Sequence, residues 1–129
     1  MAVALIPNIL PLLTVLATMG ALGIPLKPTT AMVFSIGLGI AVDDSIHFLS
    51  AYTHHRRNHT ASEAITYAYR TAGRSMLDTS IVLVAGFSAV AASEFEGFLL
   101  LGTLTAWVVV VALATDLLLM GPLLRALDR

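Results

Sequence analysis

Two adjacent acidic residues, Asp43 and Asp44, interrupt a long apolar stretch, and His47 follows them one helical turn later. The stretch runs from Pro28 to Tyr52, is otherwise almost entirely apolar or small, and is long enough to cross a bilayer. A charge near the middle of a membrane helix costs about 2.5–3.5 kcal/mol even on insertion scales, so ionisable groups in such places usually have a function. The pair is therefore a candidate functional site, with His47 as a further candidate.

A helical projection, at about 100° per residue, predicts which side of this helix each residue occupies. One face holds Ile36, Gly39, Asp43 and His47, with Gly37 and Asp44 on its edge. The other face holds larger apolar residues, namely Phe34, Leu38, Val42 and Leu49. We therefore expect the acids to face a protein interior or a wet cavity and the large residues to face lipid. The alternative is a purely structural carboxylate pair bound to neighbouring helices.

The composition places these residues in a membrane protein. Of the 129 residues, 57% are hydrophobic and only 12% are charged, against about 25% charged residues in an ordinary soluble domain. The net charge of −1 gives no indication of nucleic-acid binding, and the absence of cysteine excludes disulfides and thiolate metal ligands. The expected fold is an all-α, polytopic transmembrane bundle of four spans.

The four spans are expected over residues 2–22, 29–52, 76–92 and 98–124. The first contains Pro7 and Pro11, which predict a kink, since neighbouring helices can satisfy the freed carbonyls. It has no basic leading segment and is too long for a signal peptide. The connection through Lys27 is very short, so the first two spans should form an antiparallel hairpin.

A polar, basic segment separates the second and third spans and contains His54, His55, Arg56, Arg57 and His59. We interpret it as a solvated loop in preference to a histidine metal site. Thr60 and Glu63 then match a capping box that starts a short helix over residues 61–72. This helix is amphipathic, with alanines and Ile65 on one face, and Gly73 is its expected end. It should lie on the membrane surface or against the bundle. Asp78 is expected near the start of the third span, where it would complement the helix dipole.

The fourth span contains a third acid, Asp116. Helical spacing places it on one face with Gly102, Thr105, Val109 and Ala112, whereas Trp107 points the opposite way. Small residues such as Gly102 and Ala112 favour close helix packing, and we assign Gly37 and Gly39 of the second span the same role. Asp116 lies about as far along its span as Asp44 does, so the three carboxylates are expected in one layer and Asp116 is a further candidate for the same site.

Basic residues in short loops predict the orientation. The segment between the second and third spans has Arg56, Arg57, Arg70 and Arg74, and the C-terminal tail has two more arginines. The opposite side has only Lys27, together with Glu94 and Glu96. Both termini and the amphipathic helix should therefore be cytoplasmic, in a multi-pass protein of the inner membrane.

Four motifs in order resemble permeases of the resistance-nodulation-division (RND) superfamily. They are PNILP, GLGIAVDDSIHFLSAY, EAITYAYRTAGRSMLDTSIVLVAGF and TDLLLMGPLL. The branch they resemble is the MMPL branch, which includes the mycobacterial large membrane proteins, hopanoid exporters and Patched-like proteins. The similarity extends over essentially the whole chain and implies helices three to six of one permease half, the core of a sterol-sensing-like module.

The resemblance implies an exporter driven by the proton motive force, with lipids or other hydrophobic compounds as substrates. It assigns the family's proton relay to Asp43 and Asp44. It also implies partners beyond the bilayer and protons: the remaining helices and the extracytoplasmic domains of the permease, which this chain lacks. The chain is then a fragment or one piece of a split permease that does not transport alone. No cofactor is implied.

Two other functions fit parts of the sequence. A sterol- or lipid-sensing membrane module without transport activity would share the helical layout, but the acids favour the proton-coupled version. An intramembrane aspartyl protease would commonly have an acid directly after Gly-x-Gly, whereas Ile40 follows Gly37-Leu38-Gly39 here. We therefore do not expect an enzyme, and a metal site built from Asp43, Asp44 and His47 lacks further carboxylates.

Overall fold

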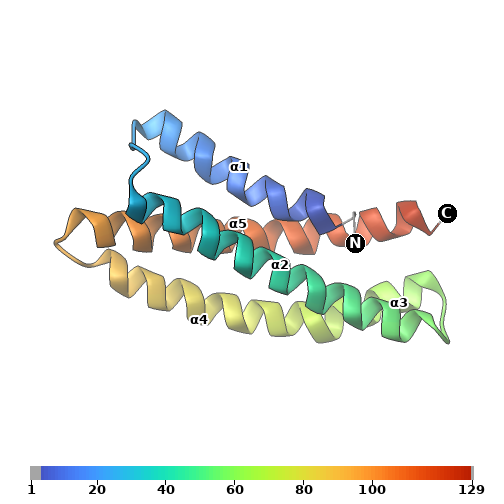
Figure 1. Ribbon diagram of the computed structural model, residues 1–129. Helices are drawn as coiled ribbons and strands as arrows, with labels where there is room; N and C mark the ends of the chain where they lie inside the picture. Colours follow the sequence, from blue (N-terminus) through green and yellow to red (C-terminus); the bar gives the residue numbers. More distant parts are fainter. Residues whose placement is uncertain (1–3, 129) are drawn as a thin grey trace.

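The computed structural model describes residues 4–128, which form an all-α bundle, as the sequence predicted. The elements are α1 (Leu5–Leu22), α2 (Pro28–Arg56), α3 (Ala61–Ala68), the π-helical segment η2 (Tyr69–Gly73), α4 (Arg74–Ala91) and α5 (Glu96–Leu127). Four helical stretches are long and apolar enough to cross a membrane: Leu5–Leu22, Pro28–Arg56, Ala61–Ala91 and Glu96–Leu127. The start of α1, the turn between α2 and α3, and the end of α5 lie at one end of the bundle (Figure 1).

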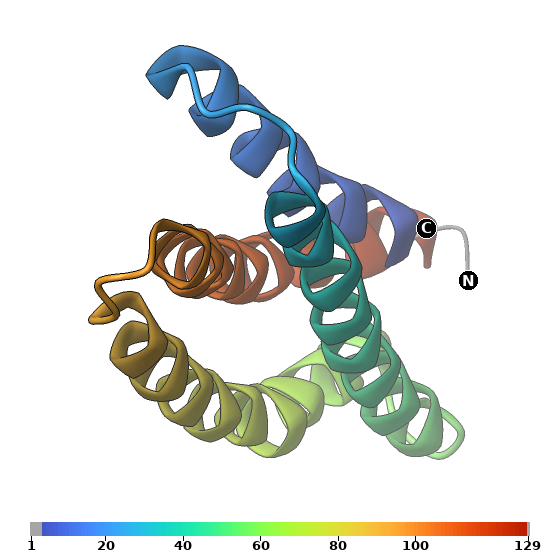
Figure 2. The same ribbon diagram turned by 60° about the vertical axis from the view of Figure 1, so that its left-hand side comes forward.

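Helix α5 is the centre of the bundle. It packs against α1, α2 and α4, whereas α2 and α4 barely contact each other. Figure 2 shows α2 and α4 close together near α3 and diverging toward the other end, while α4 stays beside α5. The last helix in the sequence therefore holds the other three spans together.

Gly102 and Gly37 lie at close contacts of α5 with α4 and with α2. A Cβ on Gly102 would collide with backbone atoms of Ala91 and Phe87 in α4. A Cβ on Gly37 would come within 3.0 Å of both methyl groups of Val108. Ala112 is also buried in this interface. Gly37 and Gly102, two of the residues with a predicted packing role, therefore lie where helices approach closely, and close contact compensates for the absence of a hydrophobic driving force between helices in lipid.

The apolar core is divided into two clusters along the helices. The cluster near α3 contains Phe48, Tyr52, Ala64, Ile65, Ala68, Ala72, Met76, Met120 and Leu124. The second contains Val15, Met19, Val33, Leu104, Val108 and Val109. On α2 and α5, the residues between the two clusters include Asp44, Ser45 and Asp116, all of them buried. A polar layer therefore separates two apolar ones.

The surface helix begins as predicted but does not end as predicted. Thr60 and Glu63 form the capping box, with the Thr60 amide donating to Glu63 Oε2 at 2.9 Å. The predicted end at Gly73 is wrong, because helical structure continues through η2 into α4. A π-helical segment absorbs an extra residue without breaking the helix, and such segments commonly bend helices. Asp78 consequently lies inside a continuous helix and outside the first turn of α4, so its predicted dipole role is also wrong.

Candidate proton-relay site

Three helices each contribute one side chain to a buried polar cluster formed by Asn8, Ser45 and Asp116. The Ser45 hydroxyl lies 2.8 Å from Asn8 Oδ1 and 3.1 Å from Asp116 Oδ1. Asn8 is 4% exposed, and Ser45 and Asp116 are fully buried. Because Asn8 is on α1, Ser45 on α2 and Asp116 on α5, the cluster connects three of the spans.

The hydrogen bonds of Ser45 relate the protonation of Asp116 to the orientation of the Asn8 amide. The Ser45 hydroxyl has a single hydrogen, so it can donate to only one of its two neighbours. If it donates to the Asn8 carbonyl oxygen, Asp116 must be a carboxylic acid that donates to Ser45. If Asn8 instead turns its NH₂ toward Ser45, the hydroxyl can donate to an ionised Asp116. The cluster therefore satisfies all its hydrogen bonds around Ser45 with an ionised Asp116 only if Asn8 presents its NH₂ group to the hydroxyl.

The second oxygen of Asp116 has no hydrogen-bond partner among the described residues. A buried polar atom without a partner destabilises a fold by about 1–3 kcal/mol, and more if the group is charged. No lysine or arginine forms an ion pair with this carboxyl group in the described part of the chain. Stability alone does not explain an acid at this position.

Asp44 lies beside the cluster and faces a groove between α2 and α4. It is 6% exposed. The groove has a volume of about 460 Å³ and is lined by Ile40, Asp43, Asp44, Asp78, Thr79, Val82 and Leu83. Asp44 directly precedes Ser45, whose hydroxyl lies 3.1 Å from Asp116 Oδ1. Asp44 therefore lines the groove and is next in sequence to the residue that contacts the buried acid, so Asp44 and Asp116 lie at about the same level of the bundle, as predicted.

The predicted face of α2 is rotated relative to the observed one. The buried residues are Thr30, Val33, Gly37, Ala41, Asp44, Ser45, Phe48 and Tyr52. Asp43 and His47, predicted to face inward, have side chains that are 71% and 68% exposed, with Asp43 Oδ1 3.5 Å from His47 Nε2. Asp43 still reaches the rim of the groove, but His47 does not line it.

Gly39 is a second correction on this helix. A Cβ built at Gly39 meets no atom within 4 Å, so the prediction that it allows a close contact is wrong for the described helices. The side of α2 toward α5 needs small residues, and Gly37 and Ala41 supply them. Leu38 and Val42 are exposed on the outside, as predicted.

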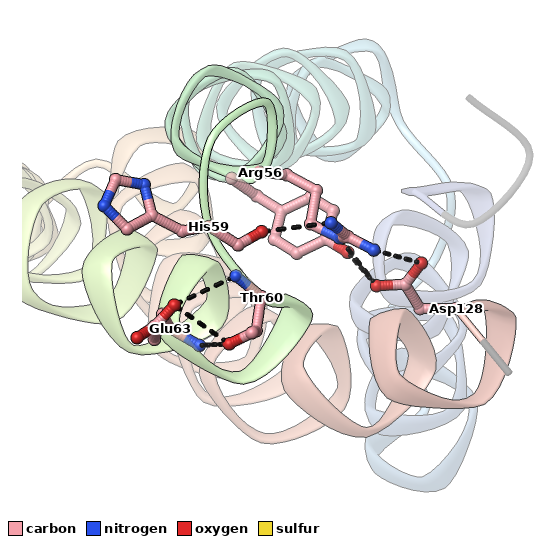
Figure 3. Close-up of polar contacts among 6 residues, drawn as sticks. Arg56, His59, Thr60, Glu63 and Asp128 are labelled. Carbon is pink, nitrogen blue, oxygen red and sulfur yellow. Dashed lines mark hydrogen bonds and ion pairs between the residues drawn. The ribbon is translucent and has the colours of Figure 1, made fainter.

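A polar contact joins the ends of α2 and α5 at the α3 end of the bundle (Figure 3). Arg56 Nε donates to Asp128 Oδ2 at 3.0 Å, and the Tyr52 hydroxyl donates to the same oxygen at 3.0 Å. Arg56 also donates to the carbonyl of His59, next to the capping box. The hydrogen bond from Arg56 lowers the pKa of Asp128 below its usual range.

The sequence pattern identifies the acids, whereas their partners Asn8 and Ser45 were not predicted. Asn8 is the one amide side chain in a first span without charges, and it stands between Pro7 and Pro11. That isolation is a usable signal, since a polar residue in a span needs a partner. Ser45 gave no such signal, because serines are common in membrane helices and bond their own backbone.

Comparisons of the chain with protein-family models, with curated proteins and with solved structures return no match.

Proposed function

We propose that this chain is the transmembrane core of one half of a proton-coupled RND-type exporter of lipids or other hydrophobic compounds. The sequence resemblance supplies the class of transporter. The observation that carries the proposal is the buried Asn8–Ser45–Asp116 cluster, which contains an acid with an unpartnered oxygen inside the membrane-spanning part of the bundle. Such an acid lowers stability, and a function that needs a proton at this place explains its presence.

In this proposal, protons enter from the groove between α2 and α4. Asp44, with Asp43 on the rim, binds the proton first. Asp116 then receives the proton, and the Ser45 hydroxyl reverses its hydrogen bond as Asp116 changes state. Asn8 rotates its amide in response. Since each of the three residues is on a different helix, one proton alters the contacts that hold α1, α2 and α5 together.

The exposed polar face of α2 indicates where the rest of the permease would lie. Asp43 and His47 are uncovered in the described bundle, although they belong to a membrane span. Such residues almost always face protein or water instead of lipid. The remaining helices of the permease would cover this face. The membrane is the inner membrane, with both termini and the α2–α3 turn on the cytoplasmic side.

The test replaces the two acids by their neutral isosteres in a permease assembled from this chain and its missing parts. Asp44→Asn and Asp116→Asn should each abolish export driven by a proton gradient, while expression and folding stay close to wild type. Glu94→Gln is the matched control, because Glu94 is exposed in the turn between α4 and α5. The proposal is wrong if both Asn variants export at the normal rate with the normal pH dependence. Binding of lipid without any proton dependence would favour a lipid-sensing module instead.

A further inference from the structure

Tyr69 extends from the π-helical segment η2 to the backbone of α5. Its hydroxyl donates a short hydrogen bond to the carbonyl oxygen of Leu117. The same hydroxyl accepts a hydrogen bond from the amide of Gly121 at 3.2 Å. In a regular α-helix, the amide of residue 121 and the carbonyl of residue 117 are each other's partners. One side chain from another helix therefore bonds both members of a backbone pair in a membrane-spanning helix.

The sequence of α5 makes this turn the weakest part of the helix. Pro122 has no N–H group, so the carbonyl of Leu118 lacks its normal helical donor. Gly121, directly before it, is less favourable in a helix than alanine by about 1 kcal/mol. Without support, the turn after Asp116 would open easily. The Tyr69 hydroxyl supplies that support at the two backbone groups of the same turn.

Gly121 and Phe48 fix the position of the Tyr69 ring. A Cβ on Gly121 would lie 2.6 Å from the Tyr69 hydroxyl oxygen and 3.1 Å from the ring, so only glycine leaves room for the contact. On its other side, the ring packs edge-on against Phe48, with ring centroids 5.0 Å apart. Phe48 is fully buried on α2, one turn beyond Asp44 and Ser45. The ring cannot shift without disturbing α2 or α5.

We propose that Tyr69 is a positioning residue for the proton site: its hydroxyl holds the turn of α5 that follows Asp116, so that η2 and this turn open and close together. The consequence for Asp116 rests on the proposed function, whereas the coupling of η2 to α5 does not. Asp116 faces Ser45 and Asp44 of α2, and Asn8 of α1 through Ser45. On α4, Asp78 lines the groove with Asp44. A change in the α5 turn alters the distance from Asp116 to these groups.

The first experiment measures backbone amide exchange in the full chain in lipid nanodiscs. Tyr69→Phe keeps the ring and removes only the hydroxyl, so the amide of Gly121 should exchange about fivefold faster, as expected for one lost hydrogen bond. The amides of residues 70–73 should accelerate with it. Tyr67→Phe is the control, because Tyr67 is in the same surface helix, partly exposed, and stacked on His55. Unchanged exchange at Gly121, or a change there without any change in residues 70–73, would overturn the proposal.

A second variant changes the α5 side of the contact between Tyr69 and Gly121. Gly121→Ala should displace the Tyr69 hydroxyl and accelerate exchange in residues 70–73, which keeps the proposal testable if Tyr69→Phe does not fold. The protonation of Asp116 is then followed by the infrared carboxyl band that Asp116→Asn removes. Its titration midpoint should shift in Tyr69→Phe and stay constant in Tyr67→Phe. A band that does not titrate contradicts the proposed function alone. A titrating band that is identical in all variants contradicts the positioning role.

Discussion

Ser45 is the residue on which the polar cluster depends, because its hydroxyl contacts both Asn8 and Asp116. Ser45→Ala would leave the side-chain oxygens facing it on both neighbours without a partner. Since each unsatisfied buried group costs about 1–3 kcal/mol, we expect a clear loss of stability in denaturant or thermal unfolding of the detergent-solubilised protein. Ser50→Ala, at an exposed position of the same helix, should change stability little. Equal, small effects would mean that water replaces the hydroxyl.

The Arg56–Asp128 contact predicts how stability depends on pH at the α3 end of the bundle. The folded pKa of Asp128 is lowered by the hydrogen bond from Arg56. The stabilisation is therefore fully present above the unfolded pKa of about 3.9 and is lost as pH falls through the folded pKa. Melting temperatures of wild type and Asp128→Asn should differ by a constant amount above about pH 5 and converge in stronger acid. A constant difference down to the most acidic pH would contradict the contact.

Which of two adjacent acids is buried could not be predicted from the sequence. Asp43 and Asp44 are separated by about 100° around the helix, and both neighbouring faces of α2 are rich in apolar residues. In a soluble protein the polar face would identify the outside, but lipid is as apolar as the protein interior. The decisive facts are the close approach of Val108 to Gly37 and the partner that Asp116 provides to Ser45. Both are contacts with residues far away in the sequence.

At the scale of elements, Gly102 determines how closely α4 and α5 pack. Gly102→Ala places a Cβ against the α4 backbone at Phe87 and Ala91, which cannot move as a side chain does. We expect a destabilisation of about 1–3 kcal/mol from overpacking, measured by unfolding in detergent. Gly86→Ala is the control, because a Cβ at Gly86, on α4, meets nothing within 4 Å. Its stability should equal or slightly exceed that of wild type, since alanine favours helix.

The elements themselves were largely predictable, since long apolar runs and turn residues mark four spans. The same-face grouping of Gly102, Thr105, Val109, Ala112 and Asp116 is confirmed by their burial, and Trp107 is 44% exposed. The continuous helix from Ala61 to Ala91 was not predicted. Glycine at position 73 is typical of a helix end. Here the Tyr69 side chain bonds to α5, and the helix continues through the π-helical segment into α4. That outcome depends on a tertiary contact.

For the whole molecule, the arrangement of the helix ends predicts the topology. The turn near Asn58 and the turn near Glu94 lie at opposite ends of the bundle (Figure 1). The natural chain has no cysteine, so a single cysteine introduced at either position is the one thiol that a reagent can label. An impermeant thiol reagent should label the Asn58 position only from the cytoplasmic side and the Glu94 position only from the external side. Labelling of both positions from one side would contradict a four-span protein.

The central position of α5 has a consequence for how the protein is made. Ribosomes deliver helices in sequence order, so α1, α2 and α4 reach the membrane before the helix against which all three pack. Until α5 is inserted, Ser45 and Asn8 lack the acid that completes their cluster. Chains halted before Glu96 should therefore remain bound to the insertion machinery and be degraded, whereas α5 supplied as a separate polypeptide should rescue them.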